Sequence, residues 1–445
     1  MLTDVGKYKR LWQSQVIAKV KEQAVELKSM SDLDGIMNRI GNARYVLLGE
    51  ATHGTHEFYV WRALLSQRLI REKGFSFIGV EGDWPDCYRI NRFVKNYSDT
   101  GENAYDVIHD FRRWPTWMWA NWEIIGLMNW LRVYNERNSQ SLKVGFYGLD
   151  VYSLGESLEA ILNYLEKYDI TAFDKAKEAI SCFEPFGFEG SDYARATRRL
   201  VPKTCQREVI DLLTEIRRKI TTFNTDPESV FNAEQNALVA VNAENYYRTM
   251  IGGGPESWNI RDRHMVTTLE RLMNFHGNKA KAIIWEHNTH IGDARATEMS
   301  AHGMVNVGEL LSGSHARDDV VKIGFGTYEG TVVAGHHWGD VMRIMKVPKA
   351  RDASWEDILH AAGDGKNVAF ATDRWKDDPL FEHPIDHRAI GVVYNNDREH
   401  YGNYVPSIIP YRYDAFIHID STEALHPVHI KPDGHQMPET FPWGF

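Results

Sequence analysis

Hydrophobic and polar positions along the chain alternate between short apolar runs and longer stretches with helical spacing. Residues 14–40 have the period of one or two amphipathic helices, and the apolar run 45–48 that follows is typical of a buried strand. Residues 55–73 return to helical spacing, and a second apolar run covers 75–81. This strand–helix–strand unit predicts two parallel strands joined by a right-handed crossover.

The same alternation continues to the C-terminal region. A helical stretch at 257–275 precedes the predicted strand at 281–286. The other predicted strands fall at 142–150, 321–328, 367–371, 388–394 and 414–419. Strands that alternate with helices predict an α/β fold with a mainly parallel or mixed sheet and flanking helices.

The pattern changes between Ser153 and Gly252, where charged, helix-period sequence replaces the strand signals. We therefore expect five segments: 1–152 as the first part of the α/β core, 153–255 as a helical insertion, 256–329 as the second part of the core, 330–366 as a small α+β addition, and 367–445 as C-terminal strands that complete the core.

Composition and charge narrow the class of protein. The 445 residues are 43% hydrophobic and 25% charged, which is ordinary for a globular protein with a large core. The net charge of −10 disfavours a general nucleic-acid binder. No apolar run is long enough for a membrane helix, and the first residues lack the apolar stretch of a signal peptide. We expect a cytoplasmic protein with a small-molecule substrate and with neither a nucleic-acid nor a membrane partner.

The three cysteines, Cys87, Cys182 and Cys205, lie far apart and form no C-x-x-C pair. We therefore expect neither a disulfide framework nor a cysteine zinc site, and we interpret Cys87 as a structural thiol.

Four predicted strands end in an acid, and these acids are Glu50, Glu81, Asp150 and Glu286. In open α/β sheets the ligand crevice lies outside the carboxyl ends of the strands. Any one of these acids, taken alone, is more often a capping or core polar group. Their recurrence at strand ends favours a shared functional site.

Two of these strand ends also carry histidines: His53 follows Glu50, and His287 and His290 lie in the segment EHNTH. A carboxylate beside a histidine fixes its tautomer and raises its basicity, as a general base requires. The chain has no G-x-S-x-G motif for a serine nucleophile. Water is therefore the predicted nucleophile, activated by His53 or by a metal.

A metal set of His53, His287 and His290 is the alternative, although EHNTH is not the zinc motif H-E-x-x-H. We favour a metal-free site and expect no cofactor. The second histidine pair, His336 and His337, is interpreted as part of a surface loop.

Two arginines and a tryptophan cluster complete the candidate residues. Arg62 and Arg261 are able to polarise a carbonyl or hold an oxyanion, although each alone would more often form an ordinary salt bridge. Of the 14 Trp, five fall between 114 and 130. Some must be core, and we expect Trp117 and Trp119 to line a pocket for a bulky apolar ligand.

These motifs resemble those of the erythromycin esterase family. The resemblance rests on GEATHGTHEF (49–58) and FIGVEGDWPD (77–86), and it continues through FRRWPTWMWANWE (111–123), KVGFYGLD (143–150), SWNIRDRHM (257–265), IIWEHNTHIGD (283–293) and the segment 388–420. It implies an α/β core with a helical insertion and a small added domain. It also implies a hydrolase that opens macrolide lactones by attack of water.

The resemblance also implies roles for individual residues. The catalytic histidine of the family matches His53, its supporting acids match Glu50 and Glu81, its helix arginine matches Arg62, and its later active-site histidines match His287 and His290. We expect substrate contacts from Arg261, Glu286, Trp117 and Trp119. The expected activity is hydrolysis of a carboxylic ester or lactone. The alternatives are a metal-dependent hydrolase of another substrate and a non-enzymatic accessory protein of saccharide biosynthesis.

Overall fold

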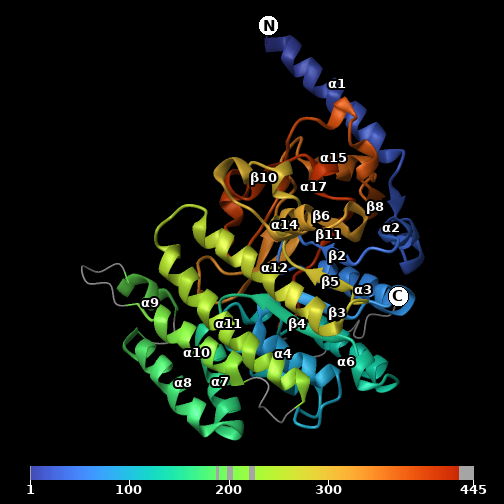
Figure 1. Cartoon of the computed structure of the whole chain (residues 1–445). Helices are drawn as coiled ribbons and strands as arrows, with labels where there is room; N and C mark the ends of the chain where they lie inside the picture. Colours follow the sequence, from blue (N-terminus) through green and yellow to red (C-terminus); the bar gives the residue numbers. More distant parts are fainter. Residues whose placement is uncertain (1, 187–189, 198–203, 220–225, 430–445) are drawn as a thin grey trace. The chain divides into compact units, whose positions relative to one another are not determined.

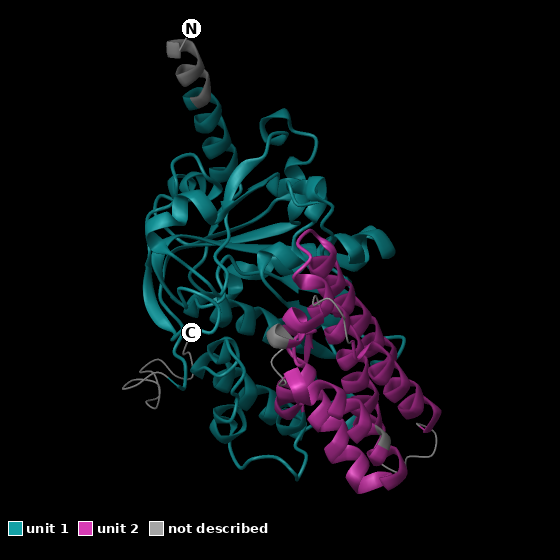
Figure 2. Ribbon diagram, turned by 90° about the vertical axis from the view of Figure 1, so that its left-hand side faces the viewer, with its two compact units in different colours: residues 1–79, 92–145, 276–445 teal, residues 80–91, 146–275 magenta. Residues whose placement is uncertain are grey.

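The computed structural model describes residues 2–186, 190–197, 204–219 and 226–429 (Figure 1). Two compact units are present, drawn in teal and magenta in Figure 2. Unit 1 comprises residues 1–79, 92–145 and 276–445, and unit 2 comprises residues 80–91 and 146–275. Among the described residues, no helix is both long and apolar enough to cross a membrane.

A mixed sheet forms the centre of unit 1. Its strands lie side by side in the order β1 (Val25–Glu26), β8 (Val368–Ala371), β11 (Ala415–Thr422), β6 (Val320–Ala334), β2 (Tyr45–Leu48) and β5 (Ala282–Trp285). The last four are parallel, β8 is antiparallel to both of its neighbours, and β7 (Arg343–Val347) pairs antiparallel with β6. The predicted α/β fold with a mixed sheet is confirmed.

The register of β2 and β5 decides where the site forms. Tyr45 pairs with Ala282 and Leu48 with Trp285, so the residues that follow Leu48 and Trp285 leave the sheet at the same edge. Every residue of both strands is buried, which is typical of parallel strands covered on both faces. Next to β5, strand β3 (Phe77–Asp83) begins, where the N–H of Ser76 donates to the carbonyl of Lys281 at 2.8 Å.

The longer helices of unit 1 lie around this sheet. Helix α3 (His56–Lys73) follows β2, with Thr55 at its N-cap and Gly74 in the left-handed region (φ +69°) at its end. The other helices of this unit are α1 (Leu2–Lys21), α2 (Asp34–Ile40), α5 (Ala104–His109), α6 (Trp122–Glu136), α13 (Asn288–Ile291), α14 (Val307–Ser314), α15 (Trp355–Ala362), α16 (Glu399–Gly402) and α17 (Ile409–Arg412). A separate hairpin pairs β9 (Ile385–Arg388) with β10 (Tyr404–Ser407).

Unit 2 is mostly helical. It contains the end of β3, nearly all of its neighbour β4 (Gly145–Asp150), and most of α4 (Trp84–Val94). A Cβ at Gly148 would lie 2.4 Å from the backbone oxygens of Gly82 and Asp83, so only glycine permits this approach of the two strands. The remaining helices are α7 (Leu154–Tyr168), α8 (Ile170–Phe183), α9 (Gly190–Thr197), α10 (Gln206–Lys219), α11 (Pro227–Met250) and α12 (Glu256–His276).

Helices α7 to α11 of unit 2 contribute buried side chains to one apolar core. The segment 153–255, predicted as a helical insertion, is helical over most of its described residues and lies entirely within unit 2.

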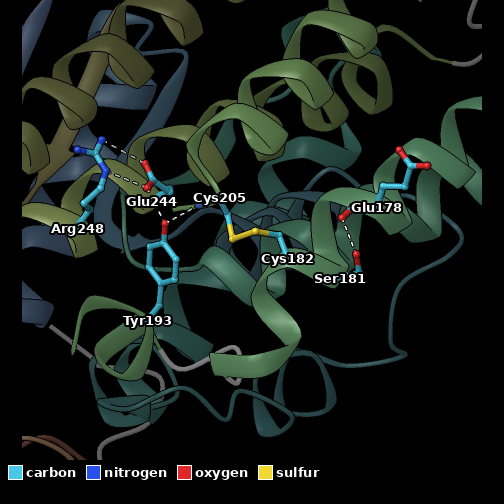
Figure 3. The surroundings of a disulfide bond; sticks show 7 residues. All are labelled: Glu178, Ser181, Cys182, Tyr193, Cys205, Glu244 and Arg248. Atoms are coloured by element: carbon cyan, nitrogen blue, oxygen red, sulfur yellow. Dashed lines mark hydrogen bonds and ion pairs between the residues drawn. A yellow bond between two sulfur atoms is a disulfide. The ribbon is translucent and has the colours of Figure 1, made fainter. Parts of the chain in front are cut away.

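A disulfide joins Cys182, near the end of α8, to Cys205, just before α10 (Figure 3). Next to it, the Tyr193 hydroxyl donates to Glu244 at 2.7 Å and accepts from the Cys205 N–H at 2.9 Å. The expectation that the cysteines form no disulfide framework is therefore wrong for this pair, because folding brings together residues 23 positions apart. Cys87 is a free, buried thiol.

One strand prediction is also wrong. Of the segment 388–394, only Arg388 belongs to a strand, and Ile390 and Val393 form isolated bridges with Thr52 and Gly335. Ile390 is fully buried in a small apolar cluster with Val332 and Tyr394. The apolar character of the segment therefore reflects burial rather than a continuous ladder. In contrast, the strand predicted at 321–328 is longer than expected and continues to Ala334.

Candidate active site

The turn after β2 is held against the end of β5 by Asn288. The Asn288 N–H donates to the Glu50 carbonyl at 2.9 Å, and its side chain exchanges hydrogen bonds with the backbone of Phe325 at 2.6 and 3.3 Å. A Cβ at Gly49 would lie 2.1 Å from Asn288 Oδ1. Glycine at position 49 is therefore required for the ends of β2 and β5 to meet beside β6 in this way.

Glu50, His53 and Arg62 form a connected group. His53 Nδ1 lies 3.0 Å from Glu50 Oε1, and Arg62 Nη2 donates to Glu50 Oε2 at 2.6 Å. All three residues are buried, with Arg62 at 0% and His53 at 7% exposure. Because the carboxylate accepts the proton on Nδ1, the lone pair of the His53 ring lies on Nε2, which is the arrangement of a general base.

Arg62 supplies the counter-charge for Glu50 inside the protein. Its guanidinium lies over the rings of Tyr59 and Trp285, 4.5 and 4.7 Å from their centroids. Burial, followed by the negative charge of Glu50, raises the pKa of Tyr59, whose hydroxyl stays protonated and donates to Met118 O at 2.9 Å. A buried carboxylate without a cation would be costly, and Arg62 supplies that cation to Glu50 beside His53.

His287 lies beside His53, with the ring centroids 4.9 Å apart. His287 caps α13, where its Nδ1 accepts from the Thr289 N–H at 3.3 Å and lies 2.8 Å from Thr289 Oγ1. An acceptor at Nδ1 places the ring proton of a neutral His287 on Nε2, so this ring presents a donor. Glu286 and His290, at 0% and 2% exposure, are buried in the same segment.

Glu81 and Arg261 belong to a second group, in unit 2. Arg261 Nη2 donates to Glu81 at 2.6 Å and to Asp150 at 2.7 Å, and Arg261 Nε donates to Asp150 at 2.9 Å. Burial works against the charge of Arg261, but Asp150, Tyr152 and Glu81 together outweigh it and raise the pKa of Arg261. This guanidinium is thus held between two carboxylates, Asp150 at the end of β4 and Glu81 inside β3. The prediction that the strand ends at Glu81 is wrong, because β3 continues to Asp83.

The predicted tryptophans are buried, Trp117 at 0% and Trp119 at 7% exposure. The Trp119 ring lies 6.0 Å from that of Tyr59, the neighbour of Arg62. Their contact with a substrate stays a prediction. His336 and His337 are exposed, as expected of a surface loop.

The structure also shows a histidine cluster that the sequence analysis did not single out. Among the described residues, His56, Glu123 and His426 have ligand atoms that all lie within 4.8 Å of one another, whereas His53, His287 and His290 form no such set. His56 and Glu123 occur inside the motifs quoted above, but their sequence positions give no sign that they meet. The roles of Asn288 and Thr289, inside EHNTH, were likewise not foreseen.

Comparison with known proteins identifies the family. The model of the family described as erythromycin esterase matches residues 70–422. The chain belongs to the erythromycin esterase family. Erythromycin esterase type II of Escherichia coli is 20% identical over 318 residues, which cover 68% of this chain and 73% of that protein. The family supports a hydrolase of the esterase kind.

Solved structures of low identity share the fold of this erythromycin esterase family member. A Bacillus cereus protein is 18% identical with a TM-score of 0.75, covering 93% of this chain and 99% of its own. A succinoglycan biosynthesis protein is 20% identical with a TM-score of 0.72, at 93% and 98% coverage. A histidine-to-asparagine mutant of the erythromycin esterase EreC, in its open conformation, is 16% identical with a TM-score of 0.65, at 90% and 97% coverage.

The residues matched by the family model include only some of the candidate site residues. Residues 70–422 contain Glu81, Arg261 and the segment 286–290, but they begin after Glu50, His53 and Arg62. The contact of His53 Nδ1 with Glu50 is therefore what makes His53 a candidate base.

Proposed function

We propose that the protein hydrolyses a carboxylic ester or lactone with water activated by His53 and without a covalent intermediate. The single observation that carries this proposal is the 3.0 Å contact between His53 Nδ1 and Glu50, whose other oxygen is held by the buried Arg62. This arrangement fixes the tautomer that an imidazole base needs, and no G-x-S-x-G nucleophile is present in the sequence.

In the proposed reaction, His53 Nε2 takes a proton from water while the water oxygen attacks the carbonyl carbon. The tetrahedral intermediate then collapses, the bond to the alcohol oxygen breaks, and the imidazolium returns its proton to that oxygen. The products are a carboxylic acid and an alcohol, which are two ends of one molecule if the substrate is a lactone. Positioned base catalysis of this kind contributes about 10²–10⁴-fold.

We assign His287 to the developing oxyanion, because the proton of its neutral ring lies on Nε2 and the ring lies next to His53. Arg62 has a different role from the one first expected. It is fully buried against Glu50, so we assign it to positioning the carboxylate rather than to the substrate carbonyl. The expected substrate contact of Arg261, which is held by Glu81 and Asp150, stays a prediction.

For the substrate we propose a bulky, apolar ester such as a macrolactone, which makes antibiotic inactivation the proposed outcome. The support is the family and the dense tryptophan segment, since large rings with few hydrogen bonds need aromatic contact area.

The test measures kcat/KM for a macrolide and for aryl esters of increasing acyl length, with His53→Asn as the background. We expect turnover that rises with substrate size and is lost in the variant. A preference for acetyl esters would refute the macrolide assignment. Absence of ester turnover combined with tight binding of an anionic saccharide would favour the accessory role suggested by the structural relative named for succinoglycan biosynthesis.

A further inference from the structure

We propose that His56, Glu123 and His426 form a binding site for one divalent transition-metal ion, with Zn²⁺ as the best fit. The three residues come from distant parts of unit 1. His56 is the first residue of α3, Glu123 lies in the first turn of α6, and His426 follows β11. Two imidazoles and one carboxylate are a ligand set that Zn²⁺ prefers.

The ligand atoms already converge on one point. The Nδ1 atoms of His56 and His426 lie 2.7 and 2.8 Å from the same atom, Glu123 Oε1. The two rings are perpendicular, with centroids 5.2 Å apart. Around a tetrahedral ion with bonds of about 2.0–2.1 Å, ligand atoms are about 3.3 Å apart, so each histidine nitrogen must move away from Glu123 Oε1 by about 0.5–0.6 Å to admit the metal.

Among the described residues, hydrogen-bond partners reach only one of the two carboxylate oxygens of Glu123. Its side chain is 1% exposed, and among the described residues no donor reaches Oε2. A buried carboxylate oxygen without a donor calls for a water molecule or an ion. The side chain of His426 is 38% exposed, which gives an ion a path from solvent.

The surroundings of the proposed metal site are negatively charged. Besides Glu123, the carboxylates of Glu423 and Glu57 act electrostatically on His426. Three acids beside two imidazoles form an environment that favours a cation.

The backbone holds the ligands in place before any metal arrives. The N–H of His56 donates to Glu423 O at 2.9 Å, and the N–H of Trp122 donates to His426 O at 3.0 Å. The segment 423–428 is thus tied to the starts of α3 and α6. An ion at this site would add a cross-link between the three segments and would stabilise unit 1, as ligands that bind only the folded state do. The fourth position is left to water, and the proposed hydrolysis at His53 does not pass through this ion.

The experiment uses the full chain after removal of metal by a chelator. Zn²⁺ is titrated by calorimetry, Co²⁺ is followed by its visible absorption, and thermal unfolding is recorded with and without Zn²⁺. We expect one ion per chain, a tetrahedral Co²⁺ spectrum and a higher Tm with Zn²⁺. Glu123→Gln and His426→Asn should each weaken binding by at least about 100-fold and abolish the Zn²⁺-dependent rise in Tm.

Two control variants locate the ion. His290→Asn tests the alternative histidine set, and His337→Asn tests an exposed histidine; both should bind Zn²⁺ as the wild type does. His426→Asn, at a half-exposed position, is the variant to use if Glu123→Gln fails to fold. The proposal is overturned if the wild type binds no ion, which would leave a purely hydrogen-bonded cluster. It is equally overturned if His290→Asn abolishes binding while His426→Asn retains it.

Discussion

His264 should make the protein markedly less stable in mild acid. This residue lies in α12 and is 2% exposed, with Nδ1 2.9 Å from the Asn242 amide nitrogen and Nε2 3.4 Å from Thr268 Oγ1. Burial lowers the pKa of His264 to about 4, although the charge of Asp150 acts in the opposite direction. The imidazole is therefore neutral in the folded protein at any pH near neutrality.

The sign and the size of this pH effect on stability follow from the difference in the pKa of His264 between the folded and unfolded states. An unfolded histidine titrates near 6.5, so between pH 6.5 and 4 the unfolded chain binds more protons than the folded one. The contribution of His264 is therefore complete above pH 6.5 and is lost as the pH falls towards 4. The full pKa difference corresponds to about 3 kcal/mol in the free energy of unfolding, of which about 2 kcal/mol is already lost at pH 5.

The measurement is the free energy of unfolding in urea, followed by far-ultraviolet circular dichroism, at pH 7.5 and pH 5. The wild type is compared with His264→Gln, which keeps an amide for hydrogen bonding but does not titrate. Other titrating groups, His426 among them, act in both proteins and cancel in the difference. The packing cost of the substitution is nearly equal at the two pH values and cancels as well.

We expect the wild type to lose about 2 kcal/mol more than His264→Gln between the two pH values. A variant at the exposed His337 should retain the loss seen in the wild type. Equal losses in the wild type and in His264→Gln would refute the reasoning, because they would show that His264 is accessible to protons in the folded state.

Three further changes test the Glu50–His53 group of unit 1 and, separately, the Arg261 group of unit 2. His53→Asn should lower kcat/KM by about 10²–10⁴-fold without changing the urea midpoint, and near-native turnover would remove His53 from the mechanism. Gly49→Ala should displace Asn288, costing about 1–3 kcal/mol of stability together with most of the activity; a normal melting curve would contradict the 2.1 Å approach. Arg261→Met should destabilise the protein by about 3–5 kcal/mol in thermal unfolding, because two carboxylates lose their cation, whereas Arg263→Met, at an exposed neighbour, should be nearly neutral.

The central strands were predictable because their environment is simple. Parallel strands buried on both faces consist of continuous apolar residues, so the run 45–48 coincides with β2 and the run 281–286 contains β5. The acids and histidines after these runs then had to leave the sheet at its carboxyl edge. The meeting of Glu50, His53 and His287 follows from that rule and from the parallel register of β2 and β5.

Long-range pairings were not predictable from spacing. Cys182 and Cys205 form their disulfide through the packing of helices, and Glu123 meets His56 and His426 across 67 and 303 residues of chain. Local sequence also does not decide the role of an arginine. Arg62 lies on a helical face with Phe58 and Tyr59, and the sequence does not show that its side chain is buried against Glu50.

The turn between β2 and α3 connects the two histidine clusters of unit 1. His53 faces Glu50 and, three positions later, His56 faces Glu123. Between them, the Gly54 carbonyl accepts from the N–H groups of Val333 and Leu425, each at 3.0 Å, and a Cβ at Gly54 would lie 2.0 Å from Val333 O. The turn is thus fixed on one side by β6 and on the other by the segment that carries His426. In the proposed reaction the base must be held within a fraction of an ångström of its productive position, so we assign the His56 cluster to the framework that positions His53. The proposed proton transfers themselves need only His53 and its carboxylate.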